Sequence, residues 1–311
     1  MNCTIGFTYF GEEKTNYMNS IHALITFCLI STQVAAQLSV VAPGAQLKKL
    51  PATFAFSEGP AVNKKGDIYF TDQPNDKIWK YDTKGKLTLF MDKTGRSNGL
   101  YFDQKGNLIA CADEKDELWS ISPDKKVTVL LSLFEGKRLN GPNDLWIDAK
   151  GGIYFTDPYY QREYWDRKQP DIAGQKVYYL RKGESAPIIV EDGVVKPNGI
   201  VGTPDGKYLY VADIAANKTY RFEINADGSL KNKQEFVPQG SDGMTLDSEG
   251  NLYITGNGVT VYDNTGKKLG NIPVSKSWTG NVCFGGKDRK LLFITASEGV
   301  YTLRMRVRGV E

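Results

Sequence analysis

The sequence of 311 residues predicts an all-β protein, a six-bladed β-propeller with four antiparallel strands in each blade. Two observations predict this architecture. First, a unit with a short polar opening, an apolar run, a tight turn and a β-rich run such as IYF or LYV recurs six times. Second, further turn signals such as DTKGK and NADGS follow downstream between more β-type runs, so each unit holds about four strands. Such units, repeated every 40–55 residues or so, are typical of propeller blades.

The six units supply the inner part of each blade in order along the chain. They span residues 57–72, 97–113, 142–157, 197–213, 241–256 and 279–296. After residue 37, no stretch keeps a helical period of 3.6 residues for three turns, which excludes helical repeats. The segment 37–56 precedes the first unit. We expect it to supply an outer strand that pairs with the last blade and closes the ring, because closure removes exposed strand edges.

Residues 1–36 are expected to be a leader or signal peptide, with Met18 as an alternative start. An apolar run ends in small residues, with Val34 and Ala36 at the positions that favour cleavage. The run is shorter than the ~20 residues needed to span a membrane. A buried helix of the mature fold is the alternative. The rest, residues 37–311, is expected to form one domain that is periplasmic or secreted and has no membrane contact after leader removal.

Composition excludes several classes of function. The formal net charge is only +3 and no long basic run occurs, which argues against a nucleic-acid partner. The single histidine, His22, lies in the expected leader, so the mature chain excludes a Ser-His-Asp triad, a Cys-His pair and the usual histidine zinc sites. Cys111 and Cys283 lack metal-binding spacing and are expected to be buried free thiols. We expect a monomer, because a closed ring needs no partner.

The opening residues of the six units are carboxylates or carboxamides. They are Glu58, Asn98, Asn143, Asn198, Asp242 and Asn281, spaced by 40, 45, 55, 44 and 39 residues. The first strand of each blade lines the central channel, so these side chains should form a ring at one mouth. Converging oxygens are costly unless a cation sits among them. Ca²⁺ fits best, with Mg²⁺, Mn²⁺, Zn²⁺ or Fe²⁺ as alternatives. The competing interpretation is that they are cap and turn residues.

Further residues are expected near the same mouth. The second strand of four units ends in an aspartate, which we interpret as a structural turn residue: Asp72, Asp113, Asp157 and Asp213. The long segment 158–175 carries Tyr159 and other aromatic residues that suit a sugar ring, so it is either a lid over the mouth or a packed surface flap. Arg138 and Trp278 each lie a few residues before a ring position and are candidates for the rim.

The chain resembles the gluconolactonase and senescence-marker-protein (regucalcin-like) family. The segments that carry the resemblance are SEGPA, RLNGPNDLWID, KPNGI and SDGMTLD, together with the six-fold spacing. Each motif is weak by itself, but the ordered set is specific and covers residues 50–303. Members are six-bladed propellers that hydrolyse lactones with a divalent metal. The paraoxonases and diisopropylfluorophosphatase are more distant relatives by architecture.

The resemblance implies a role for each matching residue. Glu58, Asn143, Asn198 and Asp242 match the metal ligands, and Asp242 is also the catalytic proton acceptor and donor. The predicted substrate-binding residues are Asn98, Arg138, Asn143, Tyr159 and Trp278. One departure is Gly141, where animal members have an arginine; Arg138 lies nearby, as in bacterial members.

The function expected is that of a divalent-metal-dependent lactonase acting on small sugar lactones. The metal polarises the lactone carbonyl, and a carboxylate must serve as the base because histidine is absent. Two alternatives stay open. One is hydrolysis of aryl esters or phosphotriesters at the same metal site, and the other is a non-catalytic ligand-binding propeller with a structural metal.

Overall fold

The computed structural model describes residues 38–276 and 278–311. The predicted leader, residues 1–36 with Met18 and His22, lies outside the described residues. The regular secondary structure of this part is almost entirely β-strand, with one short 3₁₀ helix, η1 (Gln73–Asn75). None of the helices in this part has the length and apolar character needed to cross a bilayer. The prediction of an all-β fold is therefore confirmed.

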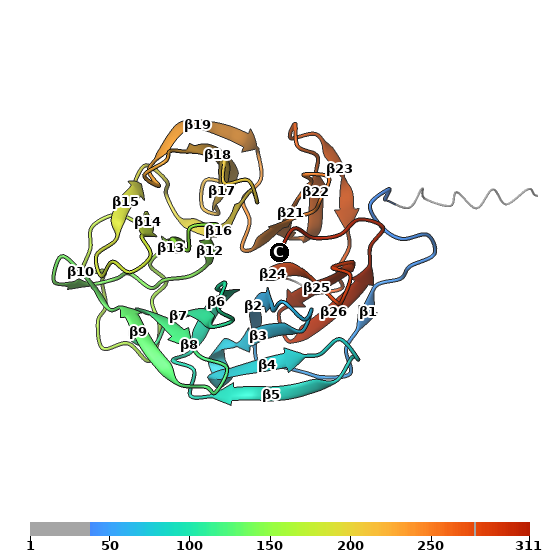
Figure 1. The fold of residues 1–311 in the computed structure, drawn as a ribbon, viewed down its shortest axis with the longest axis horizontal. Helices are drawn as coiled ribbons and strands as arrows, with labels where there is room; N and C mark the ends of the chain where they lie inside the picture. The colour runs from blue at the N-terminus through green and yellow to red at the C-terminus, as the bar shows by residue number, and fades with distance from the viewer. Residues whose placement is uncertain (1–37, 277) are drawn as a thin grey trace, which may run out of the picture. The chain divides into compact units, whose positions relative to one another are not determined.

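Six four-stranded antiparallel sheets are arranged around a common centre, as predicted (Figure 1). The first blade contains β2 (Ser57–Val62), β3 (Ile68–Asp72), β4 (Lys77–Tyr81) and β5 (Leu87–Asp92). The second contains β6 (Ser97–Phe102), β7 (Leu108–Ala112), β8 (Glu117–Ile121) and β9 (Val127–Leu131). A small hairpin of β10 (Leu133–Phe134) and β11 (Lys137–Arg138) follows. The third blade contains β12 (Leu145–Ile147), β13 (Ile153–Asp157), β14 (Lys176–Leu180) and β15 (Ile188–Glu191).

The remaining three blades repeat the pattern. The fourth contains β16 (Pro197–Gly202), β17 (Tyr208–Asp213), β18 (Lys218–Ile224) and β19 (Leu230–Val237). The fifth contains β20 (Met244–Leu246), β21 (Leu252–Gly256), β22 (Gly258–Tyr262) and β23 (Lys268–Ile272). The sixth contains β24 (Asn281–Gly285), β25 (Leu291–Ala296) and β26 (Gly299–Arg304), with β1 (Lys48–Lys49) as its outer strand. Figure 1 labels the first strand of five blades, β2, β6, β12, β16 and β24, and each lies nearest the centre.

The ring closes as the sequence predicted. Strand β1 pairs antiparallel with β26, with Lys48 opposite Thr302, so the last blade is completed by chain that precedes the first. The seam is reinforced by the buried hydroxyl of Ser57, which donates to the carbonyl oxygens of Ser297 at 3.0 Å and Gly299 at 2.9 Å. Closure therefore covers the edge of β26 and ties the last blade to the chain that leads into the first.

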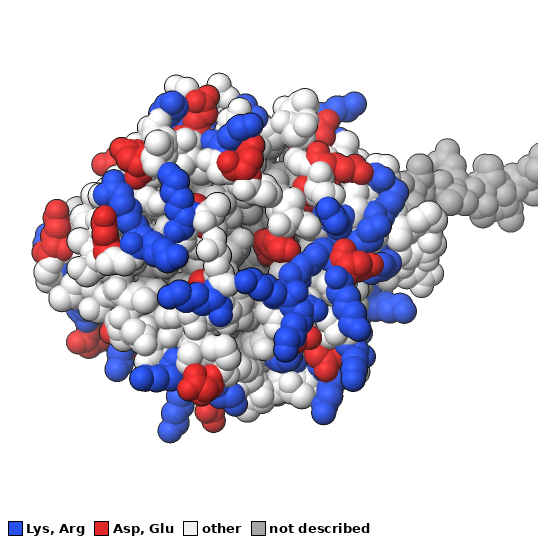
Figure 2. All heavy atoms as spheres, viewed as in Figure 1, with Lys and Arg blue, Asp and Glu red and all other residues white. Residues whose placement is uncertain are grey.

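Apolar side chains from neighbouring blades form the core between them. One cluster joins the third, fourth and fifth blades, another the fifth and sixth, and smaller ones join the remaining neighbours. Cys111 and Cys283 are buried free thiols within these layers, as predicted. The surface carries Lys, Arg, Asp and Glu side chains intermixed over the face seen in Figure 2.

The closing seam gives a test of the fold. Phe70 is fully buried and its ring lies 5.1 Å from Phe54 and 5.3 Å from Phe293 of the sixth blade. We expect Phe70→Ala to lower the free energy of unfolding by about 3–5 kcal/mol, because it removes apolar contact and leaves a cavity. Leu89→Ala, in the same sheet but 45% exposed, should change it by less than about 1 kcal/mol. Urea denaturation followed by tryptophan fluorescence measures both, and equal losses would contradict this packing.

Candidate active site

Five of the six predicted ring residues line one cavity of about 440 Å³ at one mouth of the channel. They are Glu58, Asn98, Asn143, Asn198 and Asp242, and all are buried or nearly so. The cavity is completed by Phe56, Gln73, Tyr160, Arg162, Lys196, Ile214, Ala215 and Trp278. Each ring residue stands at or just before the start of an inner strand, so five blades contribute one side chain each. A cavity of this size is in the range that holds small organic ligands.

Close approach between neighbouring inner strands explains why a glycine follows most ring residues. A Cβ atom at Gly59 would lie 2.0 Å from the carbonyl oxygen of Asn98, the ring residue of the next blade. A Cβ at Gly99 would lie 2.6 Å from the carbonyl oxygen of Asn143, and Gly199 makes the same approach to the fifth blade at 2.9 Å. Contacts this short exclude any side chain. The glycines therefore let the blades meet at the mouth, and the preceding side chains converge there.

The sixth blade corrects the prediction for Asn281, which is not among the residues that line the cavity. Gly280 occupies the place equivalent to the other ring residues, and a Cβ there would lie 2.4 Å from Oε1 of Glu58. Asn281 stands one place further along, where four of the other blades have glycine, and donates to Oδ2 of Asp144 at 3.4 Å. The sequence prediction aligned Asn281 of the segment TGN with the asparagines of SNG and PNG. This alignment placed the sixth unit one residue too far along the chain. The ring thus has five members and a gap that Glu58 fills.

The two ring carboxylates are held together in a buried environment. Burial raises the pKa of Glu58 well above its usual range, and the nearby charge of Asp242 raises it further. Burial also raises the pKa of Asp242, although hydrogen bonds from Trp278 and Asn198 act in the opposite direction. The indole Nε1 of Trp278 donates to Oδ2 of Asp242 at 2.6 Å. Two ionised carboxylates in this position repel each other, and the repulsion is relieved when they share a proton or when a positive charge lies between them.

The donor set at the ring fits a divalent cation. The Oδ1 atom of Asn198 is buried without a hydrogen-bond partner in the described structure, while its Nδ2 donates to the hydroxyl of Tyr160 at 3.1 Å. No group of three or more His, Cys, Asp or Glu side chains in the described residues could hold a metal. Glu58 and Asp242 are the two carboxylates among the residues that line the cavity, and carboxamide oxygens complete the set. Such all-oxygen sets suit hard cations, and two carboxylates balance a charge of +2.

Aspartates at the ends of second strands hold the linkers that lead into the ring. The carboxylate of Asp72 accepts from the backbone N–H groups of residues 55 and 56, at 2.9 and 3.1 Å. Asp157 accepts from residues 140 and 141, and Asp213 accepts from residues 195 and 196, at 2.7–3.0 Å. In each case the two N–H groups lie two and three residues before a ring residue. These aspartates fix the entry of the chain into the inner strand.

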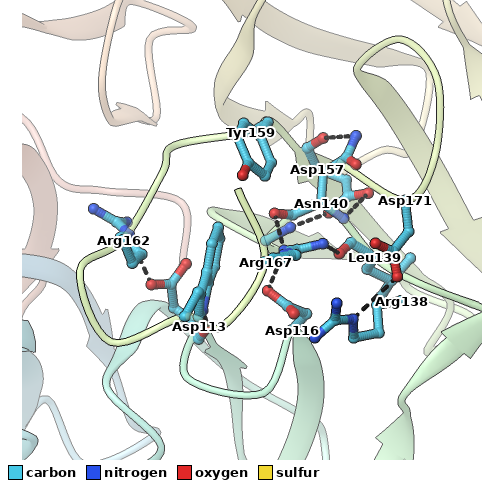
Figure 3. A network of polar contacts seen from close by, with 12 residues as sticks. Asp113, Asp116, Arg138, Leu139, Asn140, Asp157, Tyr159, Arg162, Arg167 and Asp171 are labelled. Carbon is cyan, nitrogen blue, oxygen red and sulfur yellow. Dashed lines mark hydrogen bonds and ion pairs between the residues drawn. The ribbon is translucent and has the colours of Figure 1, made fainter. Parts of the chain in front are cut away.

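The second blade uses its strand-end aspartate differently. Its linker N–H groups, including that of Arg96, donate to Asp76 instead. Asp113 is thereby available to the segment 158–175, where it accepts from Nε of Arg162 at 2.8 Å and from the hydroxyl of Tyr164. The backbone oxygen of Asp113 also accepts from the buried indole of Trp165 at 2.9 Å. The segment is therefore fastened to the second blade (Figure 3).

A buried arginine fastens the same segment at a second point. The guanidinium of Arg167 bonds to Oδ1 of Asp116 at 2.6 Å, and both side chains are 3% exposed. Arg167 also donates to the carbonyl oxygens of Leu139 and Asn140, as Figure 3 shows. The segment 158–175 therefore packs down between the second and third blades, and its start contributes Tyr160 and Arg162 to the cavity wall.

The structure corrects the expected positions of two residues at the rim. Arg138 pairs with Asp166 at 2.9 Å and with Asp171 at 3.0 Å, and it does not line the cavity. The hydroxyl of Tyr159 bonds to Gln161, and its ring faces Arg167, so it is not among the lining residues either. Trp278 does line the cavity. The sequence singled out neither Tyr160 nor Arg162, because nothing in an irregular segment tells which side chains turn inward.

The fold and site together define a class: six-bladed β-propellers with a buried carboxylate and carboxamide cavity on the ring axis. A model of the "SMP-30/Gluconolactonase/LRE-like region" matches residues 56–298, most of the chain. The protein belongs to this family, as the sequence motifs implied.

Individual relatives resemble the chain over most of their length. It is 26% identical to the gluconolactonase of Zymomonas mobilis, over 99% of this chain and 94% of that protein. It is 25% identical to a pentonolactonase of Haloferax volcanii, over 78% of this chain and 81% of that protein. The structure of a gluconolactonase from Xanthomonas campestris matches with a TM-score of 0.80 and 28% identity, covering 87% of this chain and 92% of that one.

The anchoring of the segment 158–175 gives a testable contrast. We expect Arg167→Met to lower the free energy of unfolding by about 3–5 kcal/mol, because it leaves Asp116 buried without its charge partner. Arg138→Met removes an arginine that pairs with the same segment but is 39% exposed, and should cost less than about 1 kcal/mol. Urea denaturation measures both variants. Similar losses in the two would mean that Arg167 does not anchor the segment.

Proposed function

We propose that this protein is a metal-dependent lactonase that opens small sugar lactones at the ring cavity. Membership in the family and the likeness to a gluconolactonase and a pentonolactonase support lactone hydrolysis. The observation that carries the metal-dependent form is the meeting of the buried carboxylate of Glu58 and the half-buried carboxylate of Asp242 with the unpartnered Oδ1 of Asn198. The residues that would hold the cation are Glu58, Asn143, Asn198 and Asp242. Ca²⁺ suits this oxygen set best.

A bound divalent cation would supply Lewis-acid stabilisation of the negative charge that develops on the lactone carbonyl oxygen. Asp242 accepts a proton from the water that attacks the carbonyl carbon. The bond from that carbon to the ring oxygen then breaks, and Asp242 returns the proton to the leaving oxygen, giving a hydroxy acid. The described residues contain no histidine, so the base is a carboxylate.

Other residues of the cavity position the reactants. The N–H of Trp278 holds Oδ2 of Asp242, which fixes the orientation of the carboxylate. Phe56 and Ile214 add apolar wall, which limits the water around the reacting carbon. Asn98 lines the cavity beside Asn143 and is placed to bond sugar hydroxyls.

We also infer the cellular setting from the sequence. Residues 1–36 have the pattern of a cleaved leader, so the mature protein is residues 37–311 and is periplasmic or secreted. A monomer accords with a ring that closes within one chain through the pairing of β1 with β26.

The proposed function is tested by following acid release from glucono-1,5-lactone in a pH-stat, above the spontaneous rate. We expect a chelator to abolish the activity, Ca²⁺ or another divalent cation to restore it, and Asp242→Asn to lower kcat at least about 100-fold, because the proton acceptor is lost. Asp263→Asn, in an exposed turn, is the matched control and should keep wild-type activity.

Two results would contradict the proposal in different ways. Activity that survives both the chelator and Asp242→Asn would exclude this site as the catalyst. A protein that binds Ca²⁺ tightly but opens no lactone in a panel of five- and six-membered rings would be a ligand-binding propeller with a structural metal.

A further inference from the structure

The cavity has a cationic wall as well as its two ring carboxylates. Arg162 and Lys196 both line it, from the segment 158–175 and from the linker into the fourth blade. Arg162 is already balanced, because its Nε bonds to the buried carboxylate of Asp113 at 2.8 Å. The charge of Lys196 has no such balance, since no carboxylate of the described residues forms an ion pair with it.

Lys196 is held in place without being neutralised. Its backbone N–H donates to Oδ1 of Asp213 at 3.0 Å, which fixes the linker just before the ring residue Asn198. Its ammonium lies 4.2 Å from the centre of the Tyr160 ring. The aromatic face attracts the cation but carries no net charge, so the ammonium remains free to pair with an anion.

The position of Lys196 relative to the ring carboxylates is set by Tyr160. The hydroxyl of this tyrosine accepts from Nδ2 of Asn198, while the face of the same phenol ring lies against the ammonium. Tyr160 therefore contacts both the Lys196 ammonium and the ring residue Asn198 within one cavity. A sugar lactone is small enough to enter a cavity of this size. A lactone whose carbonyl lies at the ring residues would extend its opposite end toward Lys196.

We propose that the substrate is a sugar lactone that carries a second, free carboxylate, and that Lys196 is the specificity-determining residue that binds this group. The inference rests on the proposed function. When a divalent cation balances Glu58 and Asp242, and Asp113 balances Arg162, the remaining charge in the cavity is that of Lys196. A neutral lactone leaves this ammonium without a counter-charge, whereas a carboxylate substituent pairs with it.

The test uses two lactones that differ only at the distal carbon. D-Glucaro-1,4-lactone has a carboxylate there, and D-glucono-1,4-lactone has a hydroxymethyl group. The wild-type protein is expected to show the higher kcat/KM for the glucaro compound. Lys196→Met should lower the ratio of the two kcat/KM values about ten-fold, and Lys196→Arg should retain most of it. Lys207→Met, at an exposed turn of the same blade, is the control and should leave the ratio unchanged.

Salt dependence gives a second measurement that does not depend on how well a variant folds. Because an ion pair is screened, kcat/KM for the glucaro lactone should fall as NaCl increases, relative to the glucono lactone. This difference should disappear in Lys196→Met. A merely structural role for Lys196 would change both substrates alike and leave the difference in salt dependence intact.

The outcomes separate the two proposals. If the wild-type protein opens the glucono lactone as readily as the glucaro lactone, or if Lys196→Met leaves the ratio unchanged, the inference about the substrate is wrong and lactone hydrolysis stands. If the protein opens neither lactone, nor any in the panel described above, the proposed function fails and this inference fails with it.

Discussion

The close contact between neighbouring inner strands at one mouth of the channel is the constraint on which the site depends. A Cβ atom added at Gly59 would lie only 2.0 Å from the carbonyl oxygen of Asn98. The first two blades therefore approach too closely at this point for any side chain to fit between them. The packing of the backbone therefore brings the ring residues together without the help of a ligand. This is why residues as distant in sequence as Glu58 and Asp242 share one cavity, and why the order of blades determines the order of oxygens around it.

The convergence of the ring residues places two carboxyl groups close together, where each ionised form requires a positive partner. Burial raises the pKa values of Glu58 and Asp242, which means that their charged forms are disfavoured without a positive partner. The arginines nearby fill this role only in part: the charge of Arg162 lowers the pKa of Asp242, but its Nε is paired with Asp113, and Arg167 is paired with Asp116. Under the proposed function, a divalent cation from solution would supply that positive charge at the oxygen-rich centre. The cationic side chains of the protein, Arg162 and Lys196, lie in the wall of the cavity.

The sequence predicted the features that recur in each blade, but it did not predict the conformation of the segment that occurs only once. The blade number and five ring positions follow from a pattern repeated along the chain, and the closing strand follows from the segment that precedes the first unit. The shift at Asn281 arose where the pattern is weakest, since Gly280 has no side chain to mark the ring position. The segment 158–175 has no counterpart in the other blades. Whether Tyr159 or Tyr160 faces the cavity depends on tertiary contacts that local sequence does not encode.

The strand-end aspartates show how one repeated device can hold different parts of the chain. In three blades this aspartate accepts two linker N–H groups, whereas in the second blade Asp76 takes over that task. Asp113 is then free to hold the segment that carries Tyr160 and Arg162. The position of Lys196 depends on the same two features, because Asp213 fixes its backbone and Tyr160 receives its ammonium. The cationic wall therefore combines a strand-end aspartate that keeps its usual role, Asp213, with one that is relieved of it, Asp113.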